Sequence, residues 1–173
     1  EYLITQIQAR ILAVEIAEQV NHLQYIDVDW GQMDNYGENP PTKFPCALLD
    51  LRNFQHSNNA DGVQTTVCEI EVRLFDKALN TSSSGASGTL RANALRIFRL
   101  YDKIHAALHG WNVPLPSSGA DVGVPNVLAT LIRTTSARPK RSDGIKETRL
   151  NFRVAMTDAA AQPQRTHYTA TIQ

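Results

Sequence analysis

The chain is short of the residues on which several classes of small protein depend. Its 173 residues include two cysteines, too few for the disulfide framework of a small secreted domain. No apolar run approaches the roughly 20 residues that a membrane span needs. The first residues show neither the cationic region nor the small-residue cleavage site of a signal peptide. Hydrophobic residues make up 42% of the chain, enough for a core. We therefore expect a soluble, intracellular domain with no membrane partner.

An excess of charge of either sign is also lacking, since 17 Lys and Arg balance 17 Asp and Glu. The distribution is nevertheless uneven. Residues 1–87 hold five basic and twelve acidic side chains, a balance of −7, whereas residues 88–173 hold twelve and five, a balance of +7. This asymmetry suits an acidic and a basic surface that associate head to tail between copies. Alternatively, the fold interleaves the two halves, and the asymmetry disappears in space.

Hydrophobic periodicity predicts one α+β domain over residues 3–157. Apolar residues at helical spacing predict a first helix that begins near Leu3 and a second that begins after Thr89 and ends before Gly110. Period-two and apolar runs predict strands over residues 25–30, 44–54, 63–76, 127–138 and 145–157. The expected architecture is an antiparallel or mixed sheet of two hairpins plus a short strand, with two α-helices packed on one face. Residues 158–173 lack a core pattern and are expected to form an extended C-terminal arm.

Candidate catalytic and metal motifs are incomplete. The glycine-rich stretch before Thr89 lacks the Lys of a phosphate-binding loop and is typical of a linker. His105 and His109 have the spacing of a metal-binding pair, but no third ligand accompanies them. No serine lies in a G-x-S-x-G setting. We expect no catalytic residue, no metal, no cofactor and no enzymatic activity.

The cysteines offer a choice between core packing and a disulfide. A hairpin turn near residues 56–60 is expected to place Cys46 nearly opposite Cys68. Both cysteines lie on apolar runs, where a free thiol behaves as a small hydrophobe, and this favours core packing.

Two groups of charged residues remain as candidate sites. In the first hairpin Glu69, Glu71 and Arg73 alternate with apolar residues, so they are predicted to face away from the core and to be available to a neighbouring subunit. The second hairpin is crowded with basic residues: Arg133, Arg138, Lys140, Arg141, Lys146, Arg149 and Arg153. Such a cluster is a solvated face, a contact for DNA phosphates or a contact for an acidic protein surface. No aromatic residues alternate with these charges, which argues against a stacking platform for single strands.

Several local features follow one another in a characteristic order. An amphipathic N-terminal helix precedes the strand Phe44-Pro45-Cys46-Ala47-Leu48-Leu49, and a charged hairpin arm ends in Arg73-Leu74-Phe75. The second helix closes as Ile104-His105-Ala106-Ala107-Leu108-His109-Gly110, before a proline-rich loop and the final hairpin. This order resembles that of the tail terminator (tail completion) proteins of long-tailed bacteriophages and related minor tail proteins of prophages.

The resemblance implies a structural virion protein, assembled in the host cytoplasm, that caps the tail tube and joins tail to head as a ring of about six copies. The implied partners are further copies of the chain, the tail tube protein, the head–neck connector and genomic DNA, contacted without sequence preference. The expected subunit-interface residues are Glu69, Glu71, Arg73 and Arg153. The expected DNA-channel or tube-docking residues are Arg133, Arg138, Lys140, Arg141, Lys146 and Arg149. A head-completion or neck connector protein, and a small DNA-binding domain that uses the basic hairpin, are the alternatives.

Overall fold

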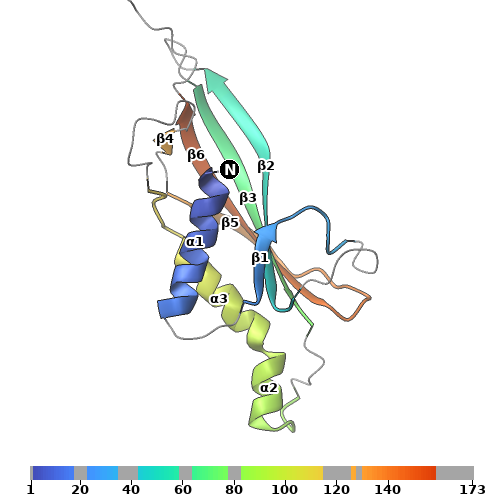
Figure 1. Cartoon of the computed structure of the whole chain (residues 1–173). Coiled ribbons are helices and arrows are strands. Elements are labelled where there is room, and N and C mark those ends of the chain that lie inside the picture. Colours follow the sequence, from blue (N-terminus) through green and yellow to red (C-terminus); the bar gives the residue numbers. More distant parts are fainter. Residues whose placement is uncertain are drawn as a thin grey trace, which may run out of the picture.

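The computed structural model describes residues 2–17, 23–34, 43–58, 64–77, 83–114, 126–127 and 130–158. The elements follow in the order α1 (Tyr2–Ala17), β1 (Tyr25–Val28), β2 (Cys46–Asn58), β3 (Gln64–Asp76), α2 (Gly88–Ala94), α3 (Arg96–Leu108), β4 (Asn126–Val127), β5 (Ile132–Ala137) and β6 (Lys146–Asp158). The predicted α+β class is confirmed (Figure 1). The expected C-terminal arm lies outside the described residues, apart from Asp158 at the end of β6. Within the described residues, no helix is long and apolar enough to span a bilayer.

One mixed sheet forms the frame of the molecule. Its strands run in the order β1-β2-β3-β6, and both β4 and β5 pair with the outer edge of β6. β1 lies parallel to β2, whereas the other pairs are antiparallel. The strand predicted over residues 145–157 is therefore confirmed as β6. The strand predicted over residues 127–138 is divided into β4 and β5. The long register of β3 with β6, from Gln64 opposite Asp158 to Asp76 opposite Lys146, joins the two halves of the chain.

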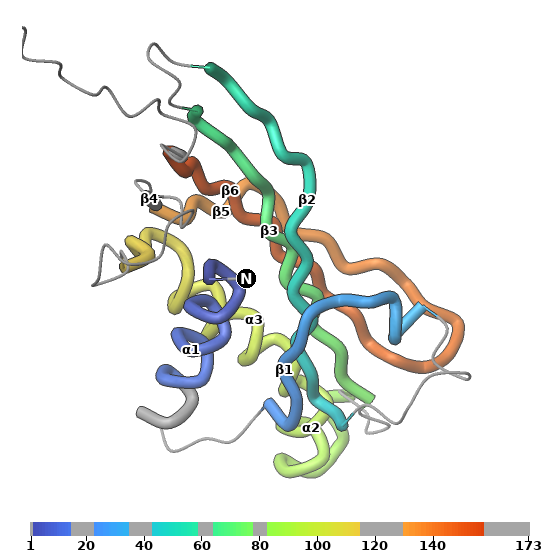
Figure 2. Tube along the Cα trace, turned by 45° about the horizontal axis from the view of Figure 1, so that its top comes forward, coloured from blue at the N-terminus to red at the C-terminus, as the bar shows by residue number. Residues whose placement is uncertain are grey.

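The main core lies between the sheet and the helices. Figure 2 shows α1 and α3 on one side of the sheet, with the segment after β1 and the β5–β6 turn on the other side. The apolar residues of α1 that recur every four positions, Leu3, Ile7 and Ile11, are buried against this face. The strands contribute every second residue, including Cys68, Ile70, Val72 and Leu74 from β3 and Leu150, Phe152, Val154 and Met156 from β6. The alternation predicted for both arms is confirmed.

The predicted second helix is in fact two helices, because the backbone leaves the helical path at Leu95. Tertiary contacts stabilise this break. The Lys146 ammonium donates to the carbonyl oxygen of Ala94 over 2.8 Å, which satisfies an acceptor at the end of α2. On the other side of the break, Arg96 pairs with buried Asp76 over 2.6 Å. The N-cap of α2 is Ser87, whose hydroxyl accepts from the backbone N–H of Leu90, so the predicted cap at Thr89 is wrong by two residues.

A smaller apolar cluster covers part of the opposite face of the sheet. It consists of Met33, Cys46, Leu48, Phe75 and Ile145. Because Ala47 and Leu49 belong to the main core and Cys46 and Leu48 to this cluster, β2 is covered on both faces there, as its apolar run predicts.

The two cysteines are free and buried, so the preference for core packing is confirmed. The register places Cys46 opposite Phe75, and the expectation that Cys46 faces Cys68 is wrong. Each cysteine belongs to a different apolar cluster. Burial raises the pKa of the Cys46 thiol to about 12 and that of Cys68 to about 11, so both remain protonated at neutral pH.

The burial pattern predicts that truncations on β6 and on the neighbouring β5 lower the free energy of unfolding by different amounts. Phe152 on β6 is fully buried, whereas Ile132 on β5 is exposed. We expect Phe152→Ala to lower the free energy of unfolding by about 3–5 kcal/mol, because it removes buried apolar surface and leaves a cavity. Ile132→Ala is the control and is expected to cost less than about 1 kcal/mol. Equal losses in urea unfolding would contradict this assignment of the core.

Candidate functional site

The face of the sheet turned away from α1 and α3 carries most of the charged strand residues. On β3 these are Glu69, Glu71 and Arg73, at positions that alternate with the main core. The antiparallel register places Glu69 opposite Arg153 and Arg73 opposite Arg149 on β6. Opposite charges that face one another across strands stabilise a pair, and like charges destabilise it, so the Arg73–Arg149 position requires carboxylates from elsewhere.

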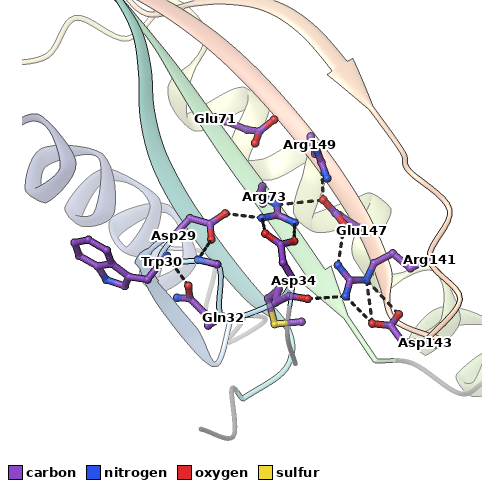
Figure 3. A network of polar contacts seen from close by, with 12 residues as sticks. Asp29, Trp30, Gln32, Asp34, Glu71, Arg73, Arg141, Asp143, Glu147 and Arg149 are labelled. Carbon is purple, nitrogen blue, oxygen red and sulfur yellow. Dashed lines mark hydrogen bonds and ion pairs between the residues drawn. The ribbon is translucent and has the colours of Figure 1, made fainter. Parts of the chain in front are cut away.

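Arg73 obtains three carboxylates from two distant segments, the segment after β1 and the start of β6 (Figure 3). Its Nη1 donates to Oδ2 of Asp29 over 2.7 Å, and its Nη2 donates to Oδ1 of Asp34 over 2.7 Å. Its Nε donates to Oε1 of Glu147 over 3.2 Å. The side chains of Arg73 and Asp29 are each 7% exposed and that of Glu147 is 1% exposed. A buried guanidinium with three acceptors satisfies the requirement that buried charges be paired.

Glu147 extends this network to the second hairpin. Besides Arg73, it accepts hydrogen bonds from Arg149 over 2.5 Å and from Arg141 over 3.2 Å. Arg141 also pairs with Asp143 and donates to the backbone carbonyl of Met33 over 2.6 Å. The residues of these contacts (Asp29, Met33, Asp34, Arg73, Arg141, Asp143, Glu147 and Arg149) are called the Arg73 network below. It joins the segment after β1, the centre of the sheet and the β5–β6 turn.

Stacking on an aromatic ring adds to the same contacts. The guanidinium carbon of Arg73 lies 5.0 Å from the centroid of the Phe75 ring, and that of Arg141 lies 5.6 Å from it. Cations at this distance from an aromatic ring are attracted by its quadrupole. Phe75 therefore links the charged network to the apolar cluster that contains Met33.

Hydrogen bonds within the network shift the pKa values of several of its members. Burial acts to lower the pKa of Arg73, but hydrogen bonds to Asp34 and Asp29 outweigh this effect, and the pKa lies above its usual value. The hydrogen bond from Arg73 lowers the pKa of Asp34. The hydrogen bond from Arg141 likewise lowers the pKa of Asp143. Arg73, Asp34 and Asp143 are therefore charged at neutral pH, and the ion pairs connect the segment after β1, the sheet and the β5–β6 turn.

A polar hollow of about 300 Å³ lies beside the network, between Asp29, Asp34, Asp50, Arg52, Glu71, Arg73 and Arg149. Its charges are largely paired with one another, since Arg52 bonds Glu71 and approaches Asp50. Within the described ranges, no group of three or more His, Cys, Asp or Glu is placed to hold a metal ion. His105 and His109 stack on each other, and His109 Nδ1 accepts from the backbone N–H of Arg133. Burial lowers the pKa of His105.

The expected interface residues have different environments. They all face away from the main core, as predicted. The expected availability is wrong for Glu71 and Arg73, which are buried, because Arg52 covers the first and the segment after β1 covers the second. Glu69 is half-buried and bonds Asn53, whereas Arg153 is exposed. A role in a subunit interface stays a prediction for all four.

The basic cluster does not form one surface. Arg141 and Arg149 belong to the Arg73 network on one face of the sheet. On the helix side, Arg133 donates to the Tyr101 hydroxyl over 2.8 Å, and Arg138 stacks over Phe98 at 4.5 Å. Lys146 bonds α2, and Lys140 is exposed in the turn. Asp29, Asp34 and Glu147 were not predicted as partners of these arginines. The alternation on β3 predicts one apolar and one exposed face, and the segments that cover the charged face lie far away in the sequence.

The uneven charge along the sequence is partly balanced in space in the part of the chain that the structure describes. Asp76 of the first half pairs with Arg96 of the second, and Glu69 lies opposite Arg153 in the register. Other ion pairs, such as Arg73–Asp29 and Arg141–Asp143, join residues of the same half, so both interpretations of the charge asymmetry stay predictions.

The fold is similar to that of solved structures. No family model matches the chain. No curated protein matches it either. Among the solved structures, a chain from the "Virion of native gene transfer agent (GTA) particle" superposes with a TM-score of 0.57 at 10% sequence identity. The match covers 90% of this chain and 94% of that chain. The two chains therefore share a fold over nearly their whole lengths.

The burial of the network predicts a large effect of Arg73→Ala. This change leaves the buried carboxylate of Asp29 without its arginine partner and removes one of the three arginines bonded to Glu147, and we expect a loss of about 3–5 kcal/mol in the free energy of unfolding. Arg153→Ala, which removes an exposed arginine of the same sheet face, is the control and is expected to cost less than about 1 kcal/mol. Urea denaturation of both variants measures the difference. Similar, small losses would show that the network contributes little.

The lowered pKa of Asp34 predicts a pH dependence with a definite sign. A carboxyl whose pKa is lower in the folded state stabilises the fold above its unfolded pKa of about 4, and this stabilisation is lost as the pH falls through the folded value. Asp34→Asn should therefore lower stability at neutral pH and flatten the decline below about pH 4. Asp102→Asn, at an exposed position on α3, is the control. An unchanged slope of stability against pH in Asp34→Asn would contradict the assignment.

Proposed function

We propose that this chain is a structural virion protein of a phage-like particle, a tail terminator that closes the head-proximal end of the tail tube as a ring of about six copies. The observation that carries the proposal is the fold shared with a virion chain of a gene transfer agent over 90% of this chain. The order of elements in the sequence, which resembles that of tail terminators, supports the finer assignment. The partners would be further copies of the chain, the tail tube protein, the connector at the neck and the DNA that passes through the channel.

The charged face of the sheet is consistent with this role. Its charges stabilise the contact between the segment after β1 and the second hairpin, through pairs such as Arg73–Asp29 and Arg141–Glu147. A ring subunit requires this kind of rigidity, because each copy transmits the position of its neighbour. The far ends of β2 and β3 also extend past α1 and α3 (Figure 1), and residues 53–58 of β2 are exposed there. In a ring this arm would reach an adjacent virion protein.

The contacts also divide the roles of the basic hairpin. Arg133, Arg141, Lys146 and Arg149 make hydrogen bonds within the chain and would position the hairpin. Arg138 and Lys140 are exposed at its turn and would contact the tube rim or DNA phosphates. Glu69 and Arg153 would contribute to the side contact between subunits. A DNA-binding domain that uses the whole cluster is less compatible with this division, because the cluster lies on two faces of the sheet.

The experiment deletes the gene for this chain from the genome that encodes the particle. The particles that assemble without the protein are then examined by negative-stain electron microscopy. We expect filled heads and separate tails, because the two would lack their joint, and we expect the purified protein to restore joining. Arg138→Ser/Lys140→Ser should restore joining poorly, whereas Lys43→Ser, at an exposed position elsewhere, should restore it fully.

Two outcomes would contradict the proposal. Joined particles in the absence of the protein would show that the chain is dispensable for the head–tail joint. Heads that lose their DNA beside complete, capped tails would favour the neck connector.

A further inference from the structure

Trp30 is an exposed aromatic side chain on a fixed acidic turn. Trp30 is 80% exposed. Figure 3 shows the indole directed away from the Arg73 network. The turn is held in place, because the Trp30 N–H donates to Gln32 over 2.6 Å and Asp29 is bonded to Arg73. Residues 23–34 include Asp27, Asp29 and Asp34 and no basic residue. A rigid, exposed tryptophan is the kind of residue that dominates the binding energy of protein interfaces.

A second feature lies on the helix side of the sheet. The break at Leu95 is accompanied by a hollow of about 740 Å³ along α2 and α3, lined by Gly88, Arg91, Ala92, Leu95, Phe98, Arg99 and Asp102. We call it the α2–α3 hollow. Ala92, Leu95 and Phe98 give it an apolar lining, and the exposed Arg91 and Arg99 lie at its rim.

Further positive charge adjoins the α2–α3 hollow. Arg138 lies over the Phe98 ring, and Phe98 also lines a neighbouring hollow of about 400 Å³ that includes Lys140. Among the described residues that line the α2–α3 hollow, Asp102 alone is acidic.

We propose that Trp30 of one copy of the chain inserts into the α2–α3 hollow of the next copy. The hollow is open and shallow, and its apolar lining offers the indole ring a surface on which to pack. Asp27 and Asp34 give the turn around Trp30 negative charge, and the Asp34 side chain is 56% exposed although it pairs with Arg73. This charge is complementary to Arg91 and Arg99 of the hollow and to Arg138 beside it. The inference rests on the proposed function, because it specifies the contact that would close the ring.

The position of the two surfaces explains why the contact joins different copies. The turn that carries Trp30 packs through Met33 on the face of the sheet that carries Phe75, whereas α3 packs on the opposite face. One surface of each copy is thus directed to one neighbour and the second to the other neighbour. A contact between two different surfaces is heterologous, and it forms a ring when the rotation between copies closes.

The same features disfavour nucleic acid as the occupant of the hollow. Duplex DNA would bring phosphates to the rim and nothing apolar to the lining of Ala92 and Leu95. A protein segment with one aromatic side chain among carboxylates satisfies both parts of the surface.

Site-specific photo-crosslinking tests the contact directly. Trp30 is replaced by p-benzoylphenylalanine, an aromatic photo-reactive residue, in a mixture of isotope-labelled and unlabelled chains assembled on tail tubes. We expect crosslinked peptides that combine one labelled and one unlabelled chain and that map to residues 88–102. The control places the same probe at Ile132, an apolar side chain that is 48% exposed on β5. Crosslinks from position 30 only to other regions, or equal crosslinking of residues 88–102 from position 132, would overturn the inference.

Sedimentation of substituted chains gives an independent measurement. Trp30→Ala should weaken association between copies roughly thirtyfold or more, as expected for an interface residue that contributes at least about 2 kcal/mol. Ile132→Ala, which truncates an exposed apolar side chain on β5, is the control and should associate as the unsubstituted chain does. If Trp30→Ala still assembles normally on tail tubes, this inference fails and the proposed function stands. If the unsubstituted chain stays monomeric and leaves tail tubes bare, both fail.

Discussion

The burial of one positive charge, on Arg73, determines how the rest of the structure is arranged. A guanidinium in the middle of a covered strand is stable only with carboxylates around it, and the sheet itself places Arg149 opposite it. Asp29 and Asp34 therefore lie on the sheet beside it, with Met33 packed between them against Phe75. Glu147 completes the set and fixes the second hairpin through Arg141 and Arg149. One interaction thus connects the acidic first half of the chain to the basic second half.

Local patterns were sufficient to predict most of the elements and the apolar faces of α1, β3 and β6. The alternation through Val72 on β3 and the four-residue spacing through Ile7 on α1 depend only on near neighbours in the sequence. The remaining features depend on partners far along the chain. The break at Leu95 carries no glycine or proline, and it follows from contacts of Lys146 and Arg96 with other elements. The alternation on β3 predicts an exposed Arg73. The segment that covers it lies about 40 residues earlier, and no local pattern reveals this contact.

The sequence predicted where the charged residues of the site lie but not which of them bond within the chain and which remain exposed. The sequence singled out the charged face of β3 and the basic hairpin, and the structure shows that most of these side chains bond other groups of the same chain. The exposed features are different ones: the Trp30 turn, the α2–α3 hollow, and Arg138 and Lys140 at the hairpin turn. A rigid body with a few distinct contact surfaces is what a ring-forming virion protein needs. We therefore infer that the paired charges make the subunit rigid and that the exposed aromatic and basic residues serve assembly.

The central claim is that this chain forms the ring between the tail tube and the neck. Electron cryo-microscopy of the intact particle tests it most directly, because the fold of each copy and its place along the tail are seen together. The account predicts one closed ring of about six copies at the head-proximal end of the tube, with the hairpin turn directed at the tube rim or the channel. Density for this chain along the length of the tube, within the capsid or at the distal tip of the tail would contradict it.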